Sequence, residues 1–403
     1  CYLCPSGACC TQLSCPIDEQ CEVGRTGVLC GSCVSGHSAA LGSQQCQPNE
    51  VCDNYKWMVP LVVLLPLLAV VLSLVVYRPL HDPYARTPRV SAVFGIFIYY
   101  YQVMPLLVSR MLQTAQKGAL LALSNAFGLN FEQGDSKGLC LFPDQTPVSK
   151  KFMNYTIFGV SVSWVILFCV ATVVRNSLVE REPWCLAPLV YTLLFVLDLG
   201  FSTVLQSTFE LLHCETVGGN SVLLLSGDVT CFSGWQNGLF VLLVPVVVYP
   251  IGVLYFARTL RRGQSPSRRA AWETLCLPYH NNKRWCSMLP LCRRVLLIVV
   301  RTFILDPTDR ALALFMFCLL FLIMDLWITP HRHVEARFFN ALLQLLLVIL
   351  AAVHIMEGAC VEFSSCMEGP AFGTEFLVGV ASASPPLLFI ALVLSMRYRK
   401  TIE

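Results

Sequence analysis

Four ionisable side chains fall inside long apolar stretches, where a charge is unfavourable: Asp198, Asp325, Arg301 and His354. Even lenient scales give about 3 kcal/mol for a charge at the centre of a bilayer, so such groups mark a functional path or a buried pair. A transport interpretation makes Asp198 and Asp325 ion or proton ligands along a hydrated path. We favour the alternative, in which Asp198 pairs with a cation or a hydroxyl and fixes packing, because only Ser202 lies one turn beyond it.

Three arginines follow one helical face in the same region. Arg293 and Arg294 precede Arg301 by eight and seven residues, a spacing of about two helical turns. They lack the every-third-residue repeat of a voltage sensor. We expect Arg293 and Arg294 to extend toward the lipid headgroups at the membrane surface.

The elements that must position these groups are apolar helices. The 403-residue chain is 56% hydrophobic and 13% charged, with a mean hydropathy of +0.64, which leaves too little polar surface to coat a soluble globule. A helix needs roughly 20 apolar residues to cross a bilayer. Nine stretches qualify, at 57–77, 90–112, 157–174, 185–207, 237–257, 286–305, 311–329, 337–355 and 374–396.

The distribution of cations predicts the orientation of these spans. With the cysteine-rich N-terminal segment outside, 19 of the 28 Lys and Arg residues fall on the inner side. Cytoplasmic loops carry this excess of positive charge, so the N-terminus is expected outside and the C-terminus in the cytoplasm. The outer loops are then 113–155, 208–236 and 356–373, and the main inner loop is 258–285. The five-residue connection 306–310 predicts that the flanking spans form an antiparallel hairpin.

The cysteines agree with that orientation, because disulfides persist on the oxidising side of a membrane. The isolated pairs Cys214/Cys231 and Cys360/Cys366 fall in outer loops, where we predict two intraloop disulfides. Cys140 also falls outside and could bridge to the N-terminal segment. Free thiols are expected on the inner side and in the spans, at Cys169, Cys185, Cys276, Cys286, Cys292 and Cys318.

Two further sites follow from this orientation. The sequon at Asn154 falls outside, next to a span, and is a candidate for N-glycosylation. The inner loop carries a basic set that suits anionic lipid headgroups, although an ordinary topogenic loop explains it more simply. Its members are Arg258, Arg261, Arg262, Arg268 and Arg269.

The N-terminal segment 1–52 holds ten cysteines and almost no aliphatic run, so cross-links must replace a hydrophobic core. It contains two Cys-x-x-Cys pairs, the second at Cys30 and Cys33. A zinc site is the alternative, but the intervening cysteines and the lack of a histidine cluster favour disulfides. The chain begins at a cysteine, which suggests a fragment of a longer extracellular region.

A resemblance to a known family rests on short motifs. Segment 24–38 resembles the signature of EGF-like, laminin-type repeats, and its glycines suit turns with positive φ. Together with 98–103, 124–131, 140–142, Pro330-His331-Arg332 and Asn340, it is similar to the membrane-embedded C-terminal module of large cysteine-rich surface proteins. Those proteins occur in protists, algae and invertebrates and often carry β-helix or EGF-like repeats. The later spans are distantly similar to TRP-like and polycystin-like domains, which would imply a channel-type bundle.

Other polar side chains in the spans indicate a structural role in helix packing and not a catalytic one. Tyr99, Tyr100 and Tyr101 sit in mid-span, so their hydroxyls need partners inside the protein and their helix should be central. Enzyme motifs such as a phosphate-binding loop, a nucleophile elbow or a zinc helix do not occur. We interpret His331 and His333 as a solvated end of a span, not as a metal site.

The fold expected from the sequence is an all-α multi-pass membrane helix bundle of about nine transmembrane helices with a small disulfide-rich EGF-like head. The domains are 1–54 and 55–403. We predict a non-enzymatic surface protein without cofactor or metal, acting as a receptor or as the membrane anchor of an extracellular assembly, in the plasma or ciliary membrane. The alternative is an ion channel subunit or transporter. Expected partners are membrane lipids and an extracellular protein or upstream ectodomain, with no nucleic acid; an oligomer is left open.

Overall fold

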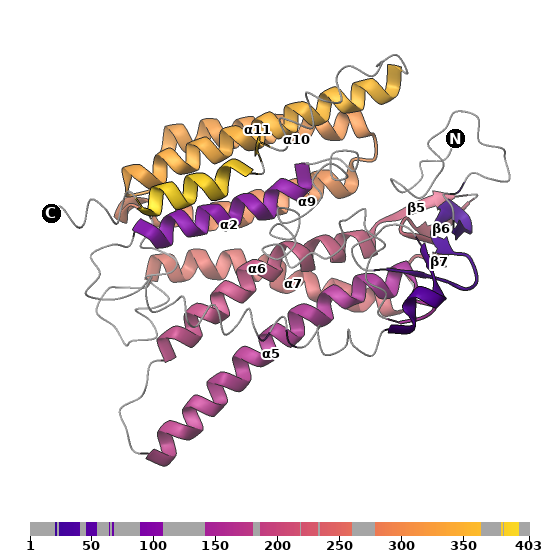
Figure 1. Cartoon of the computed structure of the whole chain (residues 1–403), viewed down its shortest axis with the longest axis horizontal. Coiled ribbons are helices and arrows are strands. Elements are labelled where there is room, and N and C mark those ends of the chain that lie inside the picture. Colours follow the sequence, from indigo (N-terminus) through magenta and orange to yellow (C-terminus); the bar gives the residue numbers. More distant parts are fainter. Residues whose placement is uncertain are drawn as a thin grey trace.

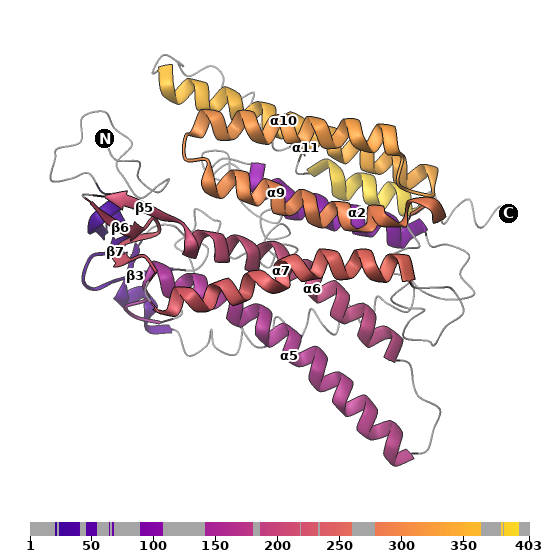
Figure 2. The same ribbon diagram turned by 180° about the vertical axis from the view of Figure 1, so that it is seen from behind.

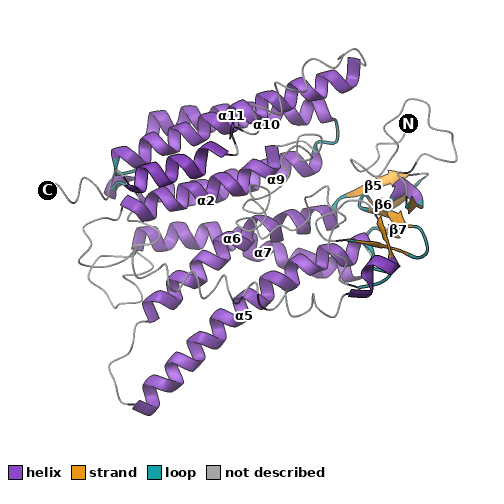
Figure 3. Ribbon diagram, in the orientation of Figure 1, coloured by secondary structure: helices purple, strands orange, loops and turns teal. Residues whose placement is uncertain are grey.

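The fold was taken from a computed structural model of the whole chain. The structure describes residues 21, 24–40, 46–54, 64, 67, 89–107, 142–179, 186–217, 219–232, 234–259, 279–363, 380–381 and 383–394. Long helices run roughly side by side, and strands occur at one end (Figures 1 and 3). The helices are α2 (Arg89–Leu107), α5 (Pro147–Val179), α6 (Leu186–Leu212), α7 (Gly234–Thr259), α9 (Leu289–Phe303), α10 (Pro307–Ile328) and α11 (Val334–Phe363), with a 3-10 segment η4 (Asn281–Met288) before α9.

Five of the described helices are long and apolar enough to cross a membrane, which indicates an integral membrane protein. They are Pro147–Ala171, Thr192–Leu212, Gly234–Thr259, Pro307–Ile328 and Val334–Ile355. The prediction of nine spans is not supported. Predicted spans 90–112 and 374–396 correspond to shorter apolar helices, Ala92–Leu107 and Ala383–Leu394. Segment 57–77 lies outside the described residues, apart from two isolated positions.

The predicted span 286–305 is corrected for a physical reason. Its helix α9 has 15 residues, because η4 occupies the preceding segment and the chain turns extended at Ile304. At 1.5 Å per residue it is about 22 Å long, shorter than the hydrocarbon core of about 30 Å. The hairpin that follows is present as predicted. Asp306 caps α10 by accepting from the backbone of Thr308 and Asp309 at 2.8 and 2.9 Å.

The surfaces of two helices fit a lipid environment. On α7 the side chains of Val241, Val244, Val248 and Ile251 are exposed, and on α10 those of Leu312, Met316, Leu320 and Ile323. These residues recur every three or four positions, so each set forms one continuous apolar stripe. Soluble proteins rarely expose such surfaces, whereas a lipid-facing helix requires them.

Helix α2 lies at the centre of the main hydrophobic core, as its tyrosines predicted. The side chains of Tyr100 and Tyr101 are fully buried. The Tyr100 hydroxyl donates a 2.7 Å hydrogen bond to the backbone oxygen of Ala381, so this phenol has the internal partner that burial requires. Helix α2 packs chiefly on α11 and also on α9.

The described part of the head is a small disulfide-bonded unit. Strand β1 (Arg25–Thr26) pairs with β2 (Ser32–Cys33), and β3 (His37–Ala39) pairs with β4 (Cys46–Pro48). Cys30 bonds to Cys21, and Cys33 bonds to Cys46. Both members of this Cys-x-x-Cys pair are therefore in disulfides, but not with each other. Gly24 and Gly27 have φ near +80°, which suits glycine at the turns.

A second sheet joins α6 to α7 at the same end of the molecule. It consists of β5 (Cys214–Val217), β6 (Asn220–Leu223) and β7 (Ser226–Thr230). The predicted disulfide between Cys214 and Cys231 closes this sheet, with Cα atoms 6.1 Å apart. Of the predicted pair Cys360/Cys366, Cys366 lies outside the described residues, as does Cys140.

The head rests directly on this sheet (Figure 2). A Cβ atom added to Gly31 would lie 2.6 Å from Cα of Ser226, and one added to Gly227 would lie 2.3 Å from the backbone oxygen of Val28. Only glycine permits so close an approach of two backbones. The hydroxyl of Ser32 donates to the Asp228 carboxylate beside this contact.

A second contact joins the head to the segment before α5. The amide of Asn49 donates to the Asp144 carboxylate at 2.7 Å, and the backbone nitrogen of Ala39 donates to the oxygen of Gln145 at 2.8 Å. The head and β5–β7 therefore occupy one end of the bundle. Segment η4 and the α10–α11 connection occupy the other end (Figure 1). The outward orientation of the head stays a prediction.

Candidate functional site: a cavity between two buried ion pairs

Helix α9 directs two consecutive arginines toward two different helices. Successive residues of an α-helix point about 100° apart, so Arg293 and Arg294 leave α9 in different directions. Arg293 reaches α10 and Arg294 reaches α6. Both guanidinium groups are buried. The prediction that they extend to the lipid headgroups is therefore wrong, because each finds a carboxylate inside the bundle.

The first pair is fully enclosed. Arg293 Nη1 and Nη2 donate to the two oxygens of Asp325 at 2.7 and 2.5 Å, in the bidentate geometry that suits a guanidinium and a carboxylate. The amide of Asn340 on α11 donates to the same carboxylate at 2.8 Å. The guanidinium also lies 5.2 Å from the ring centre of Phe321. Each oxygen of Asp325 thus accepts at least one hydrogen bond, and the carboxylate joins three helices.

The second pair is open on one side. Arg294 Nη2 contacts Asp198 Oδ1 at 2.5 Å, and Nη1 donates to the Asp198 backbone oxygen at 3.0 Å. The side-chain oxygen of Gln102 on α2 accepts from the same guanidinium. The Asp198 side chain is 37% exposed, whereas that of Arg294 is buried. Among the residues that the structure describes, no donor contacts Asp198 Oδ2.

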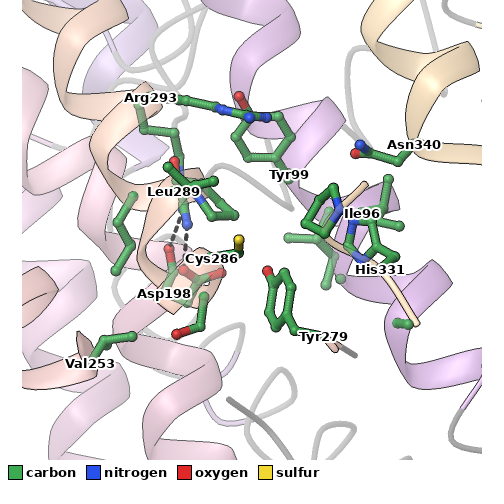
Figure 4. Close-up of a pocket in the computed structure, with 18 of the residues that line it drawn as sticks. Ile96, Tyr99, Asp198, Val253, Tyr279, Cys286, Leu289, Arg293, His331 and Asn340 are labelled. Carbon is green, nitrogen blue, oxygen red and sulfur yellow. Dashed lines mark hydrogen bonds and ion pairs between the residues drawn. The ribbon is translucent and has the colours of Figure 1, made fainter. Parts of the chain in front are cut away.

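A cavity of about 190 Å³ lies between these two pairs, and both carboxylates and both arginines line it. We call it the paired-charge cavity. Figure 4 shows the Tyr279 hydroxyl and the Cys286 thiol near the middle of this space, with Asp198 on one side and His331 and Asn340 on the other. Its lining comes from α2, α6, α7, η4, α9, α10 and α11, from the halves of these helices that lie away from the head.

The wall nearest the helix ends is built by two loop segments. Tyr279 and His331 form an isolated antiparallel bridge, and their rings stack with centroids 5.3 Å apart. His331 is buried, so its interpretation as part of a solvated end is wrong. Its bridge to Tyr279 holds it against the segment that precedes η4. Burial raises the pKa of the Cys286 thiol to about 11 and also raises the pKa of Tyr279. Both side chains are therefore uncharged at neutral pH.

The other sequence-predicted intramembrane residues lie elsewhere. Arg301 donates to the backbone oxygen of Pro105 and so joins α9 to α2. It does not line the paired-charge cavity. His354 is half-buried in α11, also outside the cavity lining.

The structure gives no support to the predicted glycosylation at Asn154, which stays a prediction. Its side chain is 2% exposed, and its nitrogen donates to the Ser207 hydroxyl at 3.0 Å. A glycan needs that nitrogen and free space around it. The sequence had placed the residue at the edge of a span starting at 157, whereas α5 begins at Pro147 and carries Asn154 into the α5–α6 contact.

Of the basic set in the inner loop, only Arg258 is described. It is exposed in the last turn of α7, at the end of the bundle away from the head. Arg261, Arg262, Arg268 and Arg269 lie outside the described residues. The expected free thiols are found at Cys169, Cys286, Cys292 and Cys318. No cluster of three metal-binding side chains occurs within the described ranges.

Several residues of the cavity were missed by sequence reasoning. Gln102 and Asn340 were noted as parts of motifs, but not as partners of the ion pairs. Two adjacent arginines and two carboxylates in neighbouring apolar segments were a usable signal, since a buried charge is nearly always paired. Tyr279 and Cys286 had no such signal, because their positions before and within η4 depend on tertiary contacts.

No family model matches this chain, and neither a curated protein nor a solved structure shows significant similarity to it.

Proposed function

We propose that this integral membrane protein binds a small solute in the paired-charge cavity and moves it across the membrane, as an ion channel subunit or transporter. One observation carries the proposal: Asp198 and Asp325, from two different helices, line the same cavity. A bundle built only for anchoring has no need of a polar space at this depth, where each charge must be compensated. Intramembrane carboxylates beside a cavity are typical of transport paths.

The open oxygen of Asp198 favours a cation as the solute. Arg294 occupies Oδ1, so Oδ2 can accept from an ammonium or contact a metal ion without breaking the pair. Asp325 is less accessible, because its side chain is enclosed and each of its oxygens already accepts from Arg293 or Asn340. We assign Asp198 to solute contact and Asp325 to positioning α9.

The test compares the Asp198→Asn variant with a control variant. Cells expressing the chain are recorded in Na⁺, K⁺, Ca²⁺ and organic ammonium solutions, and currents or isotope uptake are normalised to surface protein. Asp198→Asn should reduce the flux at least about tenfold with normal surface levels, since a charged hydrogen bond contributes about 1.5–3 kcal/mol. Asp309→Asn, exposed in the first turn of α10, is the control. If Asp198→Asn carried the same flux per surface molecule as the unsubstituted protein, the proposal would be refuted.

A second candidate, a receptor or membrane anchor, is favoured by the contact between the head and the helices. The Gly31–Gly227 approach and the Ser32–Asp228 hydrogen bond fix the head on the α6–α7 connection. On this proposal the resemblance to cysteine-rich surface proteins holds, and the protein acts without catalysis in the plasma or ciliary membrane. Cross-linking of extracellular proteins to intact cells, with residues 24–54 replaced by a flexible linker as control, tests it. Loss of a cross-linked partner in the control supports anchoring; identical patterns oppose it.

A further inference from the structure

A second cavity, at the end of the bundle away from the head, is lined by two cations and two neutral polar side chains among the described residues. It measures about 340 Å³ and is formed by His280, Asn282, Lys283 and Arg332. We call it the basic pocket. None of its lining residues is acidic. Arg332 is exposed, and no carboxylate of the described residues pairs with its guanidinium.

The electrostatics of His280 report an excess of positive charge at this place. Its pKa is lowered by desolvation and by the nearby charges of Arg337, Lys283 and Arg332. No carboxylate among the described residues counteracts these cations. The ring is therefore neutral at pH 7, and its Nε2 lies 2.9 Å from Arg337 Nη2. Since Nε2 accepts from the guanidinium, the ring proton sits on Nδ1 and is a further donor.

The cations of the pocket keep donors available. The Lys283 ammonium donates to the backbone oxygen of Ile328 and lies 3.5 Å from the Thr329 hydroxyl. An ammonium has three donors, so one remains. Lys283 is held in place by these contacts, which fix its charge at the pocket. A preorganised set of donors with uncompensated positive charge is suited to a phosphate group.

The surroundings of the pocket are those of a membrane surface. Trp327, in the last turn of α10, is 85% exposed, and Val334 and Phe338, at the start of α11, are 70% and 66% exposed. They flank Arg332 in the chain, and Trp285 is exposed on η4 beside Lys283. Tryptophan next to cations is typical of the depth of the lipid headgroups. A soluble anion would gain nothing from these apolar side chains, whereas a lipid tail would.

From this arrangement we propose that the basic pocket binds the phosphate of an anionic phospholipid, with an acyl chain along Trp327, Val334 and Phe338. The site is distinct from the paired-charge cavity and does not depend on the proposed function. It holds one lipid at the α10–α11 connection and η4, the two segments that Lys283 joins. It also differs from the diffuse attraction of an inner basic loop, because the donors converge on one pocket.

Binding is measured with the purified full chain in a neutral detergent, by thermal stabilisation with short-chain lipids. Dioctanoyl phosphatidic acid or phosphatidylglycerol should stabilise the protein at lower concentrations than dioctanoyl phosphatidylcholine. Inorganic phosphate and glycerol phosphate test the free anion. Stabilisation by these soluble phosphates at the same concentrations as by the anionic lipids would overturn the lipid assignment.

Three variants distinguish lipid binding at the basic pocket from general electrostatic attraction. Arg332→Gln should lower the affinity for the anionic lipid about fivefold, because one cation near a headgroup contributes about 1 kcal/mol. Arg258→Gln removes the same charge at the same end but outside the pocket, and should leave affinity unchanged. Trp327→Ser should lower the affinity for the lipid and leave any binding of glycerol phosphate unaltered. Equal weakening by Arg332→Gln and Arg258→Gln would refute a specific site. Both positions are exposed, so folding is preserved.

Discussion

Arg293 and Arg294 are neighbours on α9, yet they bind carboxylates on two different helices, Asp325 on α10 and Asp198 on α6. The short helix α9 thereby forms ion pairs with both α10 and α6. The two pairs differ in exposure, since the first is enclosed and the second is open at Asp198. This asymmetry leads to different expectations for mutations at the two pairs.

Removing one partner of the enclosed pair should be strongly destabilising. We expect Asp325→Asn to lower the free energy of unfolding by about 3–5 kcal/mol, because Arg293 is left as an uncompensated buried charge. Thermal unfolding in detergent measures this change. The double variant Arg293→Met with Asp325→Leu should recover most of the loss, since no charge remains. A single variant as stable as the double one would contradict the buried pairing.

The open pair should tolerate the same substitution better. Asp198→Asn retains the backbone contact of Arg294 and its hydrogen bond to Gln102, and its side chain is already partly exposed. We expect a loss below about 2 kcal/mol, smaller than for Asp325→Asn. Parallel unfolding curves of the two variants decide the order. The reverse order would assign the structural role to Asp198.

The Cys286 thiol should react slowly and with a marked pH dependence. Its pKa of about 11 means that the reactive thiolate is scarce below pH 9, and its fraction rises about tenfold per pH unit up to the pKa. Alkylation by N-ethylmaleimide, followed by peptide mass spectrometry, should therefore accelerate from pH 7 to pH 9. In denatured protein the rate should be about 100-fold higher at pH 7. Fast labelling of the native protein at pH 7 would show that the thiol is not buried.

The glycine contact between the head and β7 can be tested by adding single methyl groups. Gly31→Ala places a Cβ 2.6 Å from Cα of Ser226, so the head must shift away from the sheet. We expect faster proteolysis of the head with little change in bundle stability, because the contact is peripheral to the core. Gly238→Ala is the matched control, since a Cβ there meets no atom within 4 Å. Unchanged proteolysis in Gly31→Ala would exclude a docked head.

The disulfide Cys214–Cys231 should stabilise the sheet on which the head rests. It closes a segment with a sequence separation of 17, for which chain entropy gives roughly 3 kcal/mol. The double variant Cys214→Ser with Cys231→Ser should increase hydrogen exchange in β5–β7. Helices α10 and α11 should keep their protection and serve as the internal reference. Equal loss of protection in those helices would mean that the sheet is part of one cooperative unit with the bundle.

The sequence predicted the helical class, the hairpin between α9 and α10 and the Cys214–Cys231 disulfide, because each rests on local signals of length, spacing and turn residues. The sequence overestimated the number of membrane spans, since the apolar stretch 286–305 divides into η4 and a short α9. It also misjudged Arg293 and Arg294, because hydropathy does not reveal which helices meet. The paired-charge cavity depends on contacts among seven elements, and those contacts exist only in the folded chain.

The docking of the head on β7 also relates the head to the paired-charge cavity. The sheet β5–β7 directly continues α6 and leads into α7, and the head contacts it through backbone as well as side chains. Helix α6 carries Asp198 and helix α7 carries Tyr249, and both residues line the cavity. The sheet that receives the head therefore connects two helices that form part of the cavity wall.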